Sequence, residues 1–436
     1  MVKAFGEMRI MKGKIHISTG VKISAVVVAL VGLIVVGKGR IAAEYRQSLS
    51  DMMHSEEALL AVPTAAAAQA KIAETVEEKA PAGSIYKPGA IRVEPKAMPD
   101  HITFSAVGDN LIHETLINQA AENADYGGYD FSYFYADVAP YFQSRDLSWI
   151  NVETIINDAI EPAGYPNFST PAASGTALYN AGFDIYSLAS NHTYDYGDYG
   201  VLATRTYWEN DAPKNILTTG IWTNDAYIPV YAVDGHSIAF LTYSYGSNGF
   251  SDGESGHIIT LDQPELIEWQ IRQAKQMAEA VVVSCHWGAE DSHEVTENQR
   301  QLASFIAECG ADLIIGAHPH VIQGAEWIPT SDGRSVFCAY SIGNFVSAQT
   351  RADELLGYCL NATFDFHKDG TPVTLSDVSL TPMVTMYGYN RENIHTKFLS
   401  QCTADELDSH GVALYAPEFC ANYVYSFFGS RPECSL

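Results

Sequence analysis

Short apolar runs divide the chain after residue 100 into strand-sized pieces. The runs are rich in valine and isoleucine and end at glycine or polar residues, which is typical of buried β-strands. In five of them, metal-binding residue types follow the run within a few positions. These five predicted strands are 102–107, 149–152, 185–189, 281–285 and 313–315.

Segments with helical periodicity alternate with these strands and predict an α/β domain built in layers. The predicted helices are 114–122, 177–181, 199–210, 264–279 and 297–309. We expect Asp262 to cap the N-terminus of 264–279, and Gly310 to end 297–309. Residues 227–233 and 237–243 predict a hairpin across Asp234-Gly235. Further strands are predicted at 336–340, 358–366 and 373–382, the last two antiparallel.

The residues that follow the five strands form one ordered set. Parallel strands of an α/β sheet end at a common edge, where ligand sites form. We therefore expect the side chains of this set to converge there: Asp109, Glu153, Asn191, His192, His286, His318 and His320. The mixture of carboxylate, amide and imidazole suits Mn, Zn or Fe. The set contains more residues than the ligands that one catalytic zinc binds, so we predict one or two divalent ions. If two ions are bound, they would lie about 3.5–4 Å apart.

Each motif also has a simpler interpretation when it is taken alone. Asp109 would cap a helix, Glu153 would pair with Arg145, and Asn191-His192 would form a turn. The His318-Pro319-His320 motif is the strongest single indication of a metal. Five neighbouring residues are further candidates for the site: Asn110, His113, Asn151, Glu290 and Asn344.

Composition and charge narrow the class of protein. The chain has 436 residues, of which 47% are apolar and 18% are charged, as in a globular protein. The formal net charge of −27 argues against general nucleic-acid binding. Residues 1–50 have a formal net charge of +6. The remainder carries 17 basic and 50 acidic residues, a formal net charge of −33.

The basic N-terminal part surrounds an apolar segment, residues 23–37. Fifteen helical residues span about 22 Å, and extension back to Ile15 supplies the length of a membrane anchor. The basic flank predicts a cytoplasmic N-terminus and an extracellular body at the cell membrane. A cleaved signal peptide is the alternative. We divide the chain into tail and anchor (1–40), an Ala/Pro/Glu-rich stalk (41–100), the folded body (101–385) and a C-terminal extension (386–436).

Six motifs, in this order, resemble the CapA family of capsule or poly-γ-glutamate synthesis proteins. They are Gly108-Asp109, Asn151-x-Glu153, Ser190-Asn191-His192, His286-Trp287-Gly288-x-Glu290, His318-Pro319-His320 and Tyr340-Ser341-x-Gly343-Asn344. That family is similar to calcineurin-like metallophosphoesterases. The resemblance implies a four-layer α-β-β-α sandwich and the metal ligands Asp109, Glu153, Asn191, His286, His318 and His320. It also implies that Asp109 and His192 are catalytic, His192 as the acid.

The resemblance also contains two departures. The metallophosphoesterase pattern has Asp-x-His in its first motif, where this chain has Leu111, so Asn110 or His113 would have to substitute. The second motif of the metallophosphoesterases supplies a bridging Asp, where this chain has Asn151 and Glu153.

Two functions remain open. The first is a membrane-anchored hydrolase of the phosphoesterase type, acting on an anionic surface polymer or an envelope precursor. The second is a non-catalytic accessory subunit that binds polymer or other subunits of a capsule synthase. An amidohydrolase barrel is disfavoured, because its His-x-His comes early in the chain.

Overall fold

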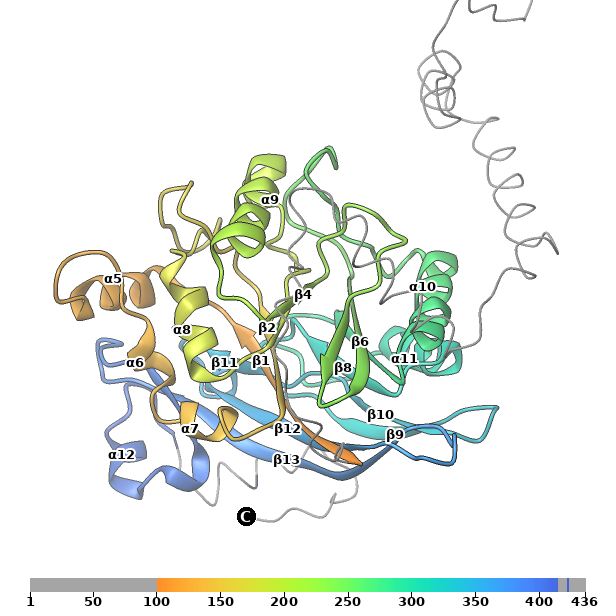
Figure 1. Cartoon of the computed structure of the whole chain (residues 1–436). Helices are drawn as coiled ribbons and strands as arrows, with labels where there is room; N and C mark the ends of the chain where they lie inside the picture. Colours follow the sequence, from red (N-terminus) through yellow and green to blue (C-terminus); the bar gives the residue numbers. More distant parts are fainter. Residues whose placement is uncertain (1–99, 415–421, 423–436) are drawn as a thin grey trace, which may run out of the picture. The chain divides into compact units, whose positions relative to one another are not determined.

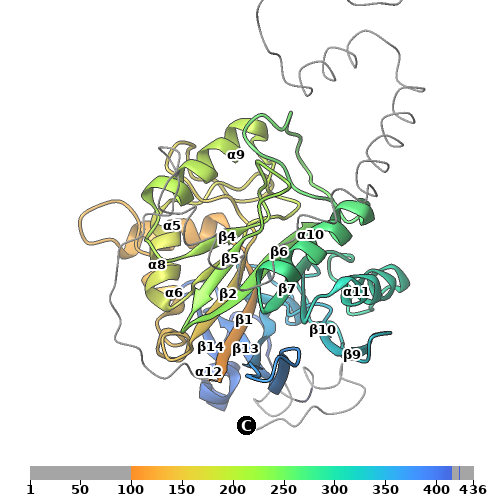
Figure 2. The same cartoon turned by 45° about the vertical axis from the view of Figure 1, so that its right-hand side comes forward.

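Two β-sheets organise the computed structural model, which describes residues 100–414 and residue 422 (Figures 1 and 2). The larger sheet has the order β14-β13-β12-β1-β2-β3-β4, with β11 also paired to β1. Its strands are β1 (His101–Asn110), β2 (Leu147–Val152), β3 (Ile185–Ser187), β4 (Leu217–Thr219), β11 (Asn344–Val346), β12 (Leu356–Asp365), β13 (Thr374–Met386) and β14 (His395–Phe398).

The smaller sheet has the order β5-β6-β7-β8-β10-β9. Its strands are β5 (Val230–Val233), β6 (His236–Ser244), β7 (Ala280–His286), β8 (Leu313–Ala317), β9 (Ala325–Pro329) and β10 (Ser335–Ala339). Four neighbouring strands, β6, β7, β8 and β10, are parallel, and the two edge strands are antiparallel to them. In the larger sheet, β1 to β4 are parallel as well.

The described part of the chain also contains α-helices, and some of them cover the outer faces of the two sheets. They are α5 (Glu114–Asn123), α6 (Ser132–Tyr135), α7 (Ala139–Phe142), α8 (Ala173–Ala181), α9 (Gly197–Thr206), α10 (Pro264–Met277), α11 (Glu297–Cys309) and α12 (Ala404–Asp408). Shorter helical turns lie at Tyr207–Asp211, Asp353–Leu355 and Leu399–Gln401. Figure 1 shows α6 and α8 on one side of the sheets and α10 and α11 on the other.

The apolar side chains along β6 point alternately into two hydrophobic cores. Ile238 and Phe240 point toward the larger sheet, where the Phe240 ring stacks on Phe104 at 6.3 Å. Leu241 and Tyr243 belong instead to the core formed with α10 and α11. A strand covered on both faces contains a continuous apolar run, which in β6 is Ile238–Leu241. The layers are therefore helix, sheet, sheet, helix.

Most predicted elements are present in the structure. The hairpin joins β5 and β6, and its turn residues Asp234 and Gly235 have positive φ angles of 48° and 92°. Helix α11 has the predicted bounds and ends at Gly310. The capping of α10 by Asp262 was wrong: the N-cap position is Gln263, and no side chain caps this helix. The Asp262 carboxylate accepts a hydrogen bond from the Thr260 hydroxyl instead.

Two further expectations concern the ends of the chain. β14, from the segment expected to be a C-terminal extension, pairs with β13 and forms the edge of the larger sheet. Among residues 100–414, no helix is both long and apolar enough to cross a bilayer. The expected anchor at 15–37 and the stalk up to residue 99 lie outside the described residues.

We predict that Phe240→Ala destabilises the protein by about 3–5 kcal/mol, because it opens a cavity between the two sheets. Phe250→Ala is the matched control, since Phe250 is 80% exposed and Phe240 only 1%. We expect the control to stay within about 0.5 kcal/mol of wild type. Urea unfolding followed by circular dichroism measures both. Equal midpoints for the two variants would contradict the packing described here.

Candidate metal centre

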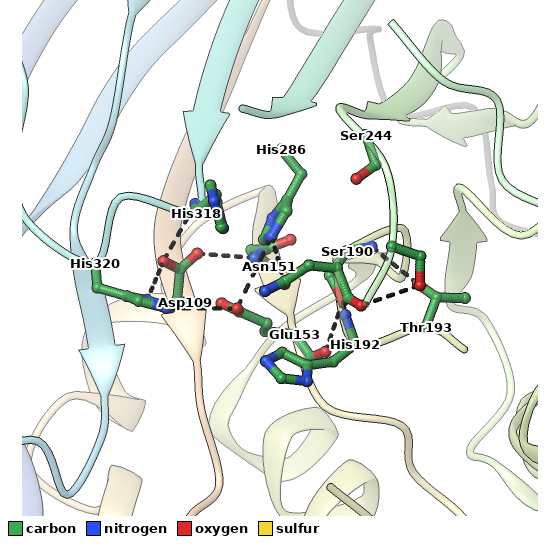
Figure 3. A network of polar contacts seen from close by, with 12 residues as sticks. Asp109, Asn151, Glu153, Ser190, His192, Thr193, Ser244, His286, His318 and His320 are labelled. Carbon is green, nitrogen blue, oxygen red and sulfur yellow. Dashed lines mark hydrogen bonds and ion pairs between the residues drawn. The ribbon is translucent and has the colours of Figure 1, made fainter. Parts of the chain in front are cut away.

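The metal-capable residues of the sequence meet where the two sheets end side by side (Figure 3). Asp109 and Glu153 come from the ends of β1 and β2 in the larger sheet, and His286 from the end of β7 in the smaller one. His318 and His320 lie in the loop that follows β8. We expected a single sheet edge; the structure instead joins the edges of two sheets. All five side chains are at most 5% exposed.

Asp109 is held in place by hydrogen bonds to both of its carboxylate oxygens. Asn151 Nδ2 donates to Oδ1 at 2.8 Å, and the backbone N–H of His318 donates to Oδ2 at 3.3 Å. The preceding glycine explains the Gly-Asp motif. A Cβ on Gly108 would lie 1.8 Å from the carbonyl oxygen of Gly343, so only glycine allows β1 to approach so closely.

Glu153 is the least satisfied polar group of the site. Both carboxylate oxygens are buried and have no hydrogen-bond partner among the described residues. The nearest basic nitrogens are Nε2 of His320 at 3.6 Å and Nε2 of His286 at 3.8 Å from Oε1. Burial, followed by repulsion from Asp109, raises the pKa of Glu153 well above its ordinary value, although His320 opposes the shift.

A left-handed backbone aims both imidazoles of the His-Pro-His motif at the carboxylates. His318 has a φ of 98° and His320 a φ of 59°, conformations that cost non-glycine residues about 1–3 kcal/mol each. His320 Nδ1–H donates to Asp109 Oδ2 at 3.1 Å and lies 3.1 Å from Asn344 Oδ1. This orients its other nitrogen toward Glu153.

The three imidazoles differ in charge. Burial lowers the pKa of His286 well below its ordinary value and that of His318 to about 3. Burial acts in the same direction on His320, but Glu153 and Asp109 outweigh it and raise its pKa to about 10. His286 and His318 are therefore neutral, the form that binds metals.

A divalent cation fits this arrangement. Two groups of three residues place their ligand atoms within 4.8 Å of one another: Glu153, His286 and His318, and Asp109, Glu153 and His320. Glu153 belongs to both groups. Nδ1 of His286 and Nδ1 of His318 are buried without a hydrogen-bond partner in the described structure. Buried carboxylates and imidazoles that lack partners are what a cation would satisfy.

Asn191 and His192 follow β3 and take different directions. Asn191 Oδ1 lies 3.0 Å from His286 Nε2, at the edge of the cluster. His192 Nδ1–H donates to Asp195 Oδ2 at 2.8 Å, and Phe168 packs edge-on against the imidazole at 4.7 Å. The Ser190 hydroxyl donates to the Glu153 carbonyl oxygen at 2.8 Å and connects this loop to β2.

The further candidates from the sequence divide into two sets. Asn151 and Asn344 contact Asp109 and His320, as described above. Asn110 points away from the cluster, since its Oδ1 accepts a hydrogen bond from Tyr135 on α6. His113 Nδ1 accepts from the backbone N–H of Ala348, and burial lowers its pKa to about 4. Glu290 is exposed.

Two residues near the site were missed. Asp195 follows His192 by three positions in the same loop, and that spacing was a usable signal. Tyr245 packs against His318 with ring centroids 4.7 Å apart. It follows a strand without any motif, so the sequence held no indication of its role.

Residues 103–349 match the family model of the bacterial capsule synthesis protein PGA_cap. This stretch covers more than half of the chain and contains every residue of the cluster. The chain belongs to the PGA_cap family. A PGA biosynthesis protein CapA of Bacillus subtilis (strain 168) is 31% identical over 224 residues, which cover 50% of this chain and 57% of that protein. A capsule biosynthesis protein CapA of Bacillus anthracis is 30% identical over 317 residues, 67% of this chain and 72% of that protein.

Two solved structures are more distant from this PGA_cap protein. One is described as a 5'-nucleotidase of Staphylococcus aureus in complex with α-ketoglutarate, with 14% identity and a TM-score of 0.37; the match covers 64% of this chain and 54% of that one. The other is a 5'-nucleotidase of Candida albicans SC5314, with 12% identity and a TM-score of 0.34, covering 62% and 52%.

We predict that the purified PGA_cap protein retains one or two equivalents of Mn or Zn after desalting, and that His318→Ala loses at least one of them. The loss follows because His318 completes one of the two groups of three ligands. Metal content by inductively coupled plasma mass spectrometry measures this. His367→Ala is the matched control, because His367 is exposed on the turn between β12 and β13. Equal metal content in wild type and His318→Ala would contradict the assignment.

Proposed function

We propose that this protein is a metal-dependent hydrolase of the metallophosphoesterase type that acts in capsule or poly-γ-glutamate metabolism. Family membership supports the biological setting, and the two sheets between helices are compatible with that fold type. The observation that carries the proposal is the buried Glu153 carboxylate, shared by two groups of ligands and without a hydrogen-bond partner in the described structure.

The roles of the residues follow from their contacts. Asp109, Glu153, Asn191, His286, His318 and His320 would hold one or two cations, with Glu153 shared. Bound divalent cations supply Lewis acidity at a phosphoryl or carbonyl oxygen. Asn344 and Asp109 orient His320, and Asn151 orients Asp109. Positioned groups of this kind make a cation site selective and rigid.

His192 would act as the general acid. A carboxylate at Nδ1 requires the proton on that nitrogen, so the hydrogen bond to Asp195 selects one tautomer. The same carboxylate stabilises the protonated imidazole. Nε2 is then the atom that gives a proton to the leaving group. Asp195 is a positioning residue in this scheme.

We predict that His192→Gln lowers kcat by about 10²-fold or more, the usual contribution of a general acid, and leaves metal content unchanged. Asp109→Asn is expected to lose both metal and activity. Hydrolysis of p-nitrophenyl phosphate, bis-p-nitrophenyl phosphate and γ-glutamyl-p-nitroanilide by the metal-loaded protein measures the effect. His367→Ala again serves as the control. Failure of the metal-loaded wild type to cleave any of the three would contradict a hydrolase.

A non-catalytic accessory subunit is the second candidate, and Leu111 favours it. Leu111 is buried at the position where the metallophosphoesterase pattern has a histidine, and neither Asn110 nor His113 replaces it in the cluster. In that case the protein binds polymer or other synthase subunits. Variants of the cluster would then leave polymer export intact in cells, whereas removal of residues 1–40 would abolish it.

The location is also part of the proposal. We propose that residues 15–37 anchor the chain in the cell membrane and that the body is extracellular. The support comes from the sequence alone, from the basic residues that flank this apolar segment. The proposed partners are an anionic surface polymer or envelope precursor and subunits of a capsule synthase.

A further inference from the structure

An exposed tyrosine lies directly against the buried imidazoles of the cluster. Tyr245 is the first residue after β6, and the sheet register places its neighbour Ser244 opposite His286. Figure 3 shows Ser244 beside His286. The backbone N–H of Tyr245 donates to the His286 carbonyl oxygen at 2.8 Å. The pairing of β6 with β7 therefore fixes the backbone position from which the Tyr245 side chain extends.

The ring of Tyr245 covers two of the predicted metal ligands. Its centroid lies 4.7 Å from that of His318, and its plane is within 10° of the His286 plane at 6.4 Å. Tyr245 is 45% exposed, whereas the two histidines are 3% exposed or less. The ring thus shields the imidazoles on one side and presents the rest of its surface to solvent.

The loop that carries Tyr245 is tied to the loop of His192. Asn248 N–H and the Ser247 hydroxyl both donate to the Asn191 carbonyl oxygen, at 2.7 and 3.0 Å. A Cβ on Gly249 would lie 1.8 Å from the Tyr194 carbonyl oxygen, so the two loops are in close backbone contact. The backbone of the loop that carries the ring is therefore held against the His192 loop, which lowers the entropic cost of ordering this loop around a ligand.

A second exposed aromatic residue lies on the His192 side. Tyr165 is 78% exposed and contacts Phe168, with ring centroids 6.3 Å apart. Phe168 in turn packs edge-on against His192. In the described part of the chain, neither a lysine nor an arginine pairs with Asp109 or Glu153. The surroundings of the site thus offer ring surfaces to a substrate and, among the described residues, no lysine or arginine paired with these two carboxylates.

We propose that Tyr245 binds the organic part of the substrate and selects a substituent that contains a ring over a short alkyl group. The inference rests on the proposed function, since it takes the phosphoryl or acyl group to lie at the metal ligands. A ring placed next to that group lies within stacking range of Tyr245. Aromatic stacking contributes a factor of roughly three to ten in affinity.

The test compares two phosphonates that cannot be hydrolysed. Phenylphosphonate and methylphosphonate carry the same anionic group and differ in the ring. Isothermal titration of each into the full-length, Mn-loaded protein gives their dissociation constants. We expect wild type to bind phenylphosphonate roughly three- to ten-fold more tightly. Tyr245→Ala should remove this preference without changing metal content, and Tyr245→Phe should keep it.

Tyr126→Ala is the matched control, because Tyr126 is fully exposed in the segment between α5 and α6. Its preference should equal that of wild type. Equal binding of the two phosphonates by wild type, or a preference that survives in Tyr245→Ala, would overturn the role of Tyr245 and leave the phosphoesterase proposal standing. If neither phosphonate bound, the result would overturn both the role of Tyr245 and the phosphoesterase proposal.

Discussion

The cost of burying two carboxylates is the constraint on which this structure depends. Asp109 and Glu153 are at most 1% exposed, at the ends of adjacent parallel strands, and a charged group in such a place must be paired. The Asp109 carboxylate accepts hydrogen bonds from Asn151, His318 and His320. The Glu153 carboxylate has no hydrogen-bond partner among the described residues. Burial and Asp109 raise the pKa of Glu153, and the nearby His320 opposes this shift only in part. A cation held by the cluster would stabilise the ionised form of the Glu153 carboxylate.

The fold brings the carboxylates and the imidazoles of the cluster together at and just beyond the ends of strands. Each sheet contributes one side of the cluster: carboxylates from the larger sheet, and imidazoles from the smaller one and the loop after it. The stacked Phe104 and Phe240 rings hold the sheets together behind the site. Backbone contacts add rigidity where the strands end, because Asp109 N–H donates to Gly343 O at 3.1 Å. Strained φ angles at His318 and His320 are maintained by this surrounding structure.

The residues of the cluster and most of the strands that carry them were predictable from the order of residues in the sequence. The features that were not predictable depend on contacts that the sequence pattern does not contain. The strands before His286 and His318 are almost wholly apolar, which marks them as central strands of a covered sheet. The strands before Asp109 and Glu153 also contain buried polar residues, among them Ser105, Ser148 and Asn151. The resemblance implied two sheets, but periodicity carries no information on which strands pair, so the assignment of each strand to a sheet had to come from the structure. Asn110 could not be assigned, because its direction depends on Tyr135, 25 residues away. The start of α10 at Pro264 was predicted correctly, but its N-cap was not, since the Asp262 carboxylate accepts a hydrogen bond from Thr260 instead.

The charge of the chain bears on how a substrate reaches the site. With a formal net charge of −27, the protein repels a polyanion at long range, where the summed field of all its charges acts. Cations at Asp109 and Glu153 would reverse the field only inside the cluster, because screening limits their reach to about 8–10 Å in physiological salt. Recognition of the proposed anionic polymer would then rely on contacts made after approach. Exposed rings such as Tyr245 and Tyr165 would provide contacts of this short-range kind, which do not depend on net charge.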